Sequence, residues 1–116
     1  MPRENYTLTK IKAFIGDNNM VMDKMIDIFL ENAPIILSKI VEGLEIKDYD
    51  QVSFQAHKLK SSIDNFSILQ LTNEIRLIEK YAKEKSSLED LPNLVNKLKI
   101  VLEAVMKEIK HDFKKA

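Results

Sequence analysis

The chain has 116 residues, and its 18 Lys and Arg residues balance its 18 Asp and Glu residues. A formal charge of zero supplies no general attraction for nucleic acid or for an anionic membrane surface. The absence of cysteine excludes disulfides, thiolate zinc sites and cysteine nucleophiles. Two glycines and three prolines are too few turn-formers for a many-stranded β fold. We therefore expect one helical domain over residues 1–116, with a core from about residue 8 to residue 109.

The first two expected helices differ in length. A short leading helix covers residues 6–15 and is broken by the polar run at residues 16–19. A long helix from about residue 18 then carries apolar residues at steps of three and four as far as Leu44. Pro34 lies within this pattern, so we expect either a kink there or a break followed by a new helix.

Three further helices are expected after residues 48–50. The third has an apolar stripe made of Val52, Ala56, Leu59, Ile63 and Phe66. We expect Ser67 to cap the start of the fourth helix with Gln70 as its capping-box partner, and the polar residues 83–87 to end that helix. The fifth helix begins near Asp90 with Pro92 in its first turn, and its tail at residues 110–116 is expected to fray.

Short connections between long amphipathic helices favour antiparallel neighbours. The sequence therefore predicts an all-α fold, an antiparallel four-helix bundle with a short leading N-terminal helix. The first residues lack a signal-peptide pattern, and no apolar run approaches the length that spans a membrane. We expect a cytoplasmic protein, a monomer that contacts neither membrane nor nucleic acid.

Few residues in this chain are suited to chemistry. Two glycines cannot supply a phosphate-binding loop, so ATP binding is not expected. His111 lies among charged residues near the carboxyl end and is given no role. His57 lies within the third helix, with Lys60 three residues on and Ser61 four residues on, which places all three on one helical face. A lysine there could screen a phosphoryl group on the imidazole, but the same spacing fits a surface histidine beside a surface lysine.

A family resemblance bears on this choice. Residues 56–68, with the sequence AHKLKSSIDNFSI, resemble the active helix of histidine-containing phosphotransfer (HPt) domains, in which a small residue follows His-x-Leu-Lys. The apolar and acidic landmarks of that family also match this chain from about residue 8 to residue 109. Ser61 and Ser67 stand where the family usually has glycine.

The resemblance implies a phosphorelay intermediate without kinase activity of its own. His57 would accept a phosphoryl group on Nε2 from the aspartyl phosphate of a receiver domain and pass it to an aspartate of another receiver. Glu79 would orient the imidazole from the next helix, Lys60 would stabilise the phosphoryl group, and Ser61 would leave clearance for the partner. The chain would need no cofactor, because Mg²⁺ is expected on the receiver.

The partners implied are receiver domains of response regulators and hybrid sensor kinases. Residues expected to contact them are Phe54, Lys58 and Asp64 around the histidine, and Ile11 and Ile15 on the leading helix. A capping role for the leading helix and a core position for Phe54 are the alternatives.

Two further alternatives remain open at this stage. Glu79 could be a surface carboxylate paired with Lys83 four residues on. The whole chain could be a non-catalytic interaction module, a degenerate HPt-like adaptor that docks receivers without phosphotransfer.

Overall fold

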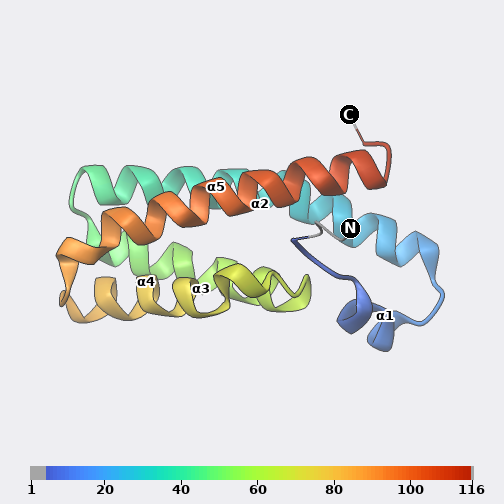
Figure 1. Cartoon of the computed structure of the whole chain (residues 1–116), viewed down its shortest axis with the longest axis horizontal. Helices are drawn as coiled ribbons and strands as arrows, with labels where there is room; N and C mark the ends of the chain where they lie inside the picture. The colour runs from blue at the N-terminus through green and yellow to red at the C-terminus, as the bar shows by residue number, and fades with distance from the viewer. Residues whose placement is uncertain (1–4, 116) are drawn as a thin grey trace.

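The computed structural model describes residues 5–115, which form five α-helices (Figure 1). They are α1 (Thr9–Ile15), α2 (Asn19–Glu45), α3 (Tyr49–Asn65), α4 (Thr72–Glu84) and α5 (Leu91–Asp112). Two short 3₁₀ turns, η1 (Leu69–Leu71) and η2 (Leu88–Asp90), precede α4 and α5. The predicted all-α class is confirmed.

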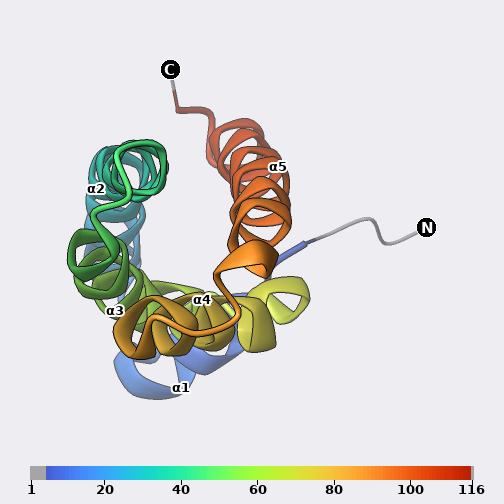
Figure 2. The same ribbon diagram turned by 90° about the vertical axis from the view of Figure 1, so that its left-hand side faces the viewer.

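The four long helices form an antiparallel bundle seen end-on in Figure 2. Each helix packs against the one that follows it, α2 on α3, α3 on α4 and α4 on α5, and α5 returns to lie along α2. The short helix α1 packs against α2 outside this ring. The predicted four-helix bundle with a leading helix is therefore confirmed.

The bundle core is made of the apolar stripes that the helical spacing predicts. Residues with no exposed surface come from all four long helices and include Ile26, Ile40, Val52, Leu59, Ile63, Ile75, Ile78, Leu98, Leu102 and Ile109. Burying one such side chain contributes about 1.5–3 kcal/mol, so these stripes hold the helices in register.

Pro34 lies inside α2, which continues without a break from Asn19 to Glu45. Of the two outcomes expected there, a new helix does not occur. Proline cannot donate the hydrogen bond to the carbonyl four residues earlier, and helices accommodate this loss by bending. Figure 1 shows α2 changing direction in its amino-terminal half.

The prediction that Ser67 caps the fourth helix is wrong. Ser67 has φ 50 and lies just past the end of α3, where its amide donates to the Asp64 carbonyl and the Ile68 amide donates to the Ile63 carbonyl. This pair of bonds is a Schellman motif, whose left-handed residue is most often glycine. The 3₁₀ turn η1 follows at Leu69–Leu71, and α4 begins only at Thr72. Gln70 donates its side-chain amide to the Asn5 side chain instead of completing a capping box.

Both ends of the described chain are tied to the bundle. The Tyr6 hydroxyl donates to Asp112 at 2.6 Å, and the Thr7 amide donates to the Phe66 carbonyl at 3.0 Å. At the other end α5 remains helical to Asp112, and the Lys115 ammonium lies 2.9 Å from an oxygen of Asp27. The expected fraying of residues 110–116 is wrong for residues 110–112, which remain in α5. Residues 113–115 lie beyond the end of the helix, where the Lys115 contact holds them, and residue 116 lies outside the described residues.

Within residues 5–115, no helix is both long enough and apolar enough to cross a bilayer.

Candidate functional site

His57 lies in the middle of α3, on the face that the helix turns toward solvent. Its neighbours Ala56 and Leu59 are fully buried, whereas 65% of the His57 side chain is exposed. The buried neighbours fix the rotation of α3, and that rotation brings the imidazole out beside α4. The imidazole is therefore accessible to a partner, while the buried neighbours of His57 hold this part of α3 against the core.

Glu79 on α4 holds one edge of this imidazole. Its Oε2 lies 2.8 Å from Nδ1 of His57, and only 19% of its side chain is exposed. An ionised carboxylate can only accept hydrogen bonds, so Nδ1 of His57 must carry the proton in this contact. In the neutral ring Nε2 then carries the free electron pair.

Lys60 joins the same carboxylate from α3. Its ammonium donates to Oε1 of Glu79 at 2.8 Å, and 29% of its side chain is exposed. Partial burial raises the pKa of Glu79, but hydrogen bonds and charge from Lys60 and His57 outweigh it, and the net pKa lies below the usual 4.5. Glu79 is thus ionised at neutral pH and bridges the two side chains.

The helical geometry explains why these three residues meet. His57 and Lys60 are three residues apart and therefore share a face of α3. Ile78 is fully buried in α4, so the adjacent Glu79 lies at the edge of the α3–α4 contact. The alternative in which Glu79 pairs with Lys83 does not match the contacts found, which run to α3.

The surface around the histidine is formed by residues within one turn of it. Ser61 is exposed, and its hydroxyl donates to the Lys58 carbonyl at 3.4 Å. Phe54 is 60% exposed, which rules out the core position considered for it, and the Lys58 ammonium lies 5.6 Å from the centre of its ring. An aromatic side chain and a cationic side chain therefore lie within one turn of His57 along α3.

The two residues of α1 expected to contact a receiver, Ile11 and Ile15, differ in their exposure to solvent. Ile11 is 3% exposed and packs into the core, so its predicted place on a docking surface is corrected to a packing role. Ile15 is half-buried against the core. The large apolar side chain that α1 exposes is Phe14.

Asp64 lies near the end of α3 and is held by Arg76 of α4. The two guanidinium nitrogens of Arg76 donate to the two oxygens of Asp64 at 2.8 and 3.2 Å. Arg76 is not among the residues expected from the sequence to have a role. Its position three residues before Glu79, on the same face of α4, is the signal that could have pointed to it.

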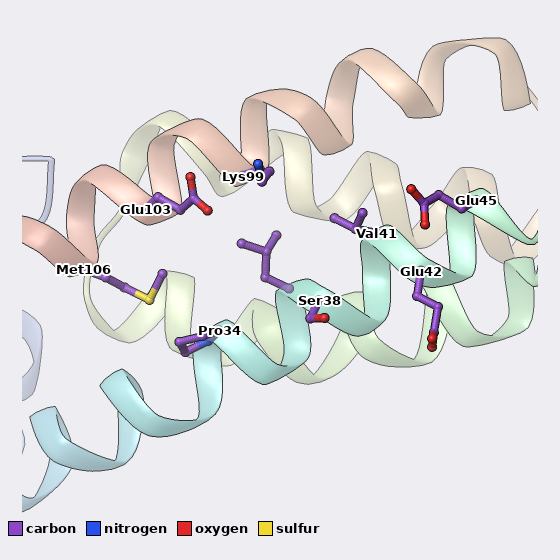
Figure 3. Close-up of a pocket in the computed structure, with 9 residues that line it drawn as sticks. Pro34, Ser38, Val41, Glu42, Glu45, Lys99, Glu103 and Met106 are labelled. Carbon is purple, nitrogen blue, oxygen red and sulfur yellow. The ribbon is translucent and has the colours of Figure 1, made fainter.

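A separate hollow of about 450 Å³ lies between α2 and α5 (Figure 3). Leu37, Val41 and Met106 give it an apolar lining, and Glu45, Lys99 and Glu103 also border it. None of these residues is a histidine or another strong nucleophile. The hollow is built by the two helices that do not carry His57 and Glu79, so it is separate from the candidate site.

Comparison with known proteins agrees with the geometry. The family model described as "Hpt domain" matches residues 24–109, which is most of the chain, and the chain belongs to this family. Neither the curated proteins nor the solved structures include a match to this chain. The protein is therefore a histidine-containing phosphotransfer module of phosphorelay signalling, in a family whose members carry phosphoryl groups between proteins, act with receiver domains and are not kinases.

Proposed function

We propose that His57 accepts a phosphoryl group from the aspartyl phosphate of one receiver domain and transfers it to an aspartate of another. The observation that carries this proposal is the contact of 2.8 Å between Nδ1 of His57 and Oε2 of Glu79. It leaves Nε2 as the nucleophilic atom of a largely exposed ring.

In the accepting step Nε2 of His57 attacks the phosphorus atom of the aspartyl phosphate. A nitrogen–phosphorus bond forms, and the bond from phosphorus to the aspartate oxygen breaks, which returns the receiver's carboxylate. The ring gains positive charge as Nε2 becomes bonded to phosphorus, and Glu79 offsets that charge through the hydrogen bond it accepts from Nδ1. Donation to the second receiver is the reverse of this step on a new aspartate.

Lys60 supplies positive charge one turn from the reacting atom. A phosphoryl group on the imidazole carries negative charge, and an ammonium within reach stabilises it. Lys60 is half-buried and already ordered by Glu79, so little conformational freedom is lost when it turns to the phosphoryl group.

The docking face that we propose extends from the imidazole toward α2. Phe54, Lys58 and the small Ser61 lie within about one turn of His57 on α3, and Lys58 also borders a hollow of about 370 Å³ between α2 and α3. Met25 and Ile28 of α2 line that hollow, and Ile28 is half-exposed. Apolar contacts at this groove and positive charge beside the ring suit a receiver, whose phosphorylation site is acidic.

The receiver supplies the remaining chemistry in this proposal. We expect Mg²⁺ to be bound by the receiver, where it neutralises charge on the transferred group. This chain contributes an imidazole, its orientation and a neighbouring cation. Purified protein is therefore expected to stay unlabelled when it is incubated with ATP alone.

Replacement of His57 tests this function directly. His57→Gln should keep the helical circular dichroism and should accept no label from a phosphorylated receiver. His111→Gln is the matched control, because the chain has two histidines and His111 lies exposed near the end of α5. The control should accept label as the parent does, and the label should be acid-labile and base-stable, as a phosphoramidate is.

Two results would contradict the proposal. Full labelling of His57→Gln would place the acceptor elsewhere. Binding of a phosphorylated receiver by the parent without any transfer of label would identify the non-catalytic adaptor considered from the sequence.

A further inference from the structure

A second charged pair adjoins the candidate site on the same two helices. Asp64 follows Lys60 by four residues on α3, and Arg76 precedes Glu79 by three residues on α4. Nη2 of Arg76 lies 2.8 Å from Oδ2 of Asp64, and Nη1 lies 3.2 Å from Oδ1. The two pairs, Lys60 with Glu79 and Asp64 with Arg76, therefore lie one turn apart along the α3–α4 interface.

These four charges interact beyond their own pairs. The hydrogen bond from Arg76 lowers the pKa of Asp64, and the charge of Lys60 lowers it further. The hydrogen bond to Asp64 raises the pKa of Arg76, and the charge of Glu79 adds to that increase. The charges of Arg76 and Glu79 therefore attract each other even while Arg76 is bonded to Asp64.

Asp64 determines where the Arg76 guanidinium is placed. Both of its oxygens accept from Arg76, and the Thr72 carbonyl accepts from Nη1 at 2.8 Å. Without Asp64 the permanently charged guanidinium would keep only the Thr72 contact. Its nearest alternative carboxylate on the same helical face is Glu79, since residues three apart on a helix are neighbours.

We propose that Asp64 is a positioning residue for phosphotransfer, because it holds Arg76 away from Glu79 and leaves both Glu79 oxygens to His57 and Lys60. This inference rests on the proposed function of His57. Asp64 then acts within the protein, instead of making the direct receiver contact expected from the sequence. Arg76 would otherwise compete with His57 and Lys60 for the carboxylate of Glu79.

The test compares Asp64→Ala, Arg76→Ala and the double variant. The first readout is the nitrogen NMR spectrum of the His57 imidazole, which reports whether Nδ1 or Nε2 carries the proton. In Asp64→Ala the freed Arg76 draws Glu79 away, so the fraction of rings protonated on Nδ1 should fall. The rate of transfer from a phosphorylated receiver should fall about twofold, the size expected of one helical ion pair.

Removal of the competitor should reverse these effects. Arg76→Ala should keep the proton on Nδ1, and the double variant should regain the tautomer and most of the rate that Asp64→Ala loses. Asp50→Ala is the matched control. Asp50 is also a carboxylate of α3 paired with a cation outside that helix, since its Oδ1 lies 3.0 Å from the ammonium of Lys85. It should leave the His57 spectrum unchanged.

Other outcomes overturn the inference. An unchanged spectrum in Asp64→Ala would show that Asp64 does not act through Glu79. A rate loss that the double variant does not recover, with the spectrum unchanged, would identify Asp64 as a receiver contact. The spectrum is recorded without any receiver, so failure of the proposed phosphotransfer and failure of this inference are separable.

Discussion

Glu79 is the residue on which the candidate site depends most, because its two carboxylate oxygens serve two different side chains. One oxygen fixes the imidazole of His57 and the other orders the ammonium of Lys60. Burial alone would raise the pKa of Glu79 and favour its neutral form. The hydrogen bonds from Lys60 and His57 keep this half-buried carboxylate ionised.

Replacing this carboxylate should slow phosphotransfer without stopping it. Glu79→Ala removes one orienting hydrogen bond, which is worth about 1 kcal/mol, so the transfer rate should fall about fivefold. The rate is measured by following label from a phosphorylated receiver to the protein. Glu74→Ala is the matched control, because Glu74 is also a half-buried carboxylate of α4 but pairs with Lys97 of α5. An equal rate in Glu79→Ala and the parent would contradict an orienting role.

At the scale of the helices, the close approach of α2 and α3 places the histidine. Gly43 is buried near the end of α2, and a Cβ added there would lie 3.0 Å from Cγ2 of Val52 and 3.2 Å from the carbonyl oxygen of Asp48. Asp48 caps α3 by accepting from the Gln51 amide at 3.1 Å. The absence of a side chain at Gly43 therefore lets the end of α2 lie close to the first turn of α3.

Enlarging Gly43 should destabilise the bundle despite the better helix propensity of alanine. Alanine gains about 1 kcal/mol of propensity over glycine, whereas overpacking a core costs about 1–3 kcal/mol. Because Val52 is fully buried and β-branched, it cannot easily move aside, and we expect Gly43→Ala to lower the free energy of unfolding by roughly 1 kcal/mol in urea denaturation.

The double variant Gly43→Ala/Val52→Ala isolates the cause. Shortening Val52 removes the nearest atom, so the double variant should lose less stability than the sum of the two single variants. Simple additivity would mean that the Val52 contact does not limit the approach of the helices.

At the scale of the whole molecule, ionised carboxylates connect neighbouring helices around the bundle. Asp64 and Glu79 join α3 to α4, and Glu74 joins α4 to α5 through Lys97 at 2.6 Å. The pKa of each of these carboxyl groups lies below its usual value. A hydrogen bond from Arg76 lowers the pKa of Asp64, and one from Lys97 lowers the pKa of Glu74. At Glu79 burial raises the pKa, but the hydrogen bonds from Lys60 and His57 outweigh it.

These lowered pKa values predict that acid weakens the fold. As pH falls through the usual values of 3.8 for Asp and 4.5 for Glu, the unfolded chain takes up protons before the folded one does, so unfolding is favoured. The stabilisation is complete above that window and is lost below the folded pKa values. Urea denaturation across this pH range should show the free energy of unfolding falling as the pH falls. Glu74→Gln should make this dependence on pH less steep. A flat dependence of stability on pH would contradict this account.

The sequence by itself determined the helices and their buried faces. Periodicity located the stripe through Val52, Leu59 and Ile63, the first-turn position of Pro92 and the exposed margin on which His57 lies. These features are local, because a helix repeats every 3.6 residues and its apolar face follows from spacing alone. The resemblance to HPt domains added the role of Glu79, whose proximity to His57 no spacing could supply.

Only the tertiary structure decided which side chains meet across helices. The pairing of Asp64 with Arg76, the second bond from Glu79 to Lys60 and the burial of Ile11 depend on the rotation and offset of separate helices. The left-handed conformation of Ser67 and the start of α4 at Thr72, after the turn η1, were likewise not predicted from the sequence. Contacts between helices depend on how all the stripes pack at once, and that packing is a property of the assembled bundle rather than of any one segment.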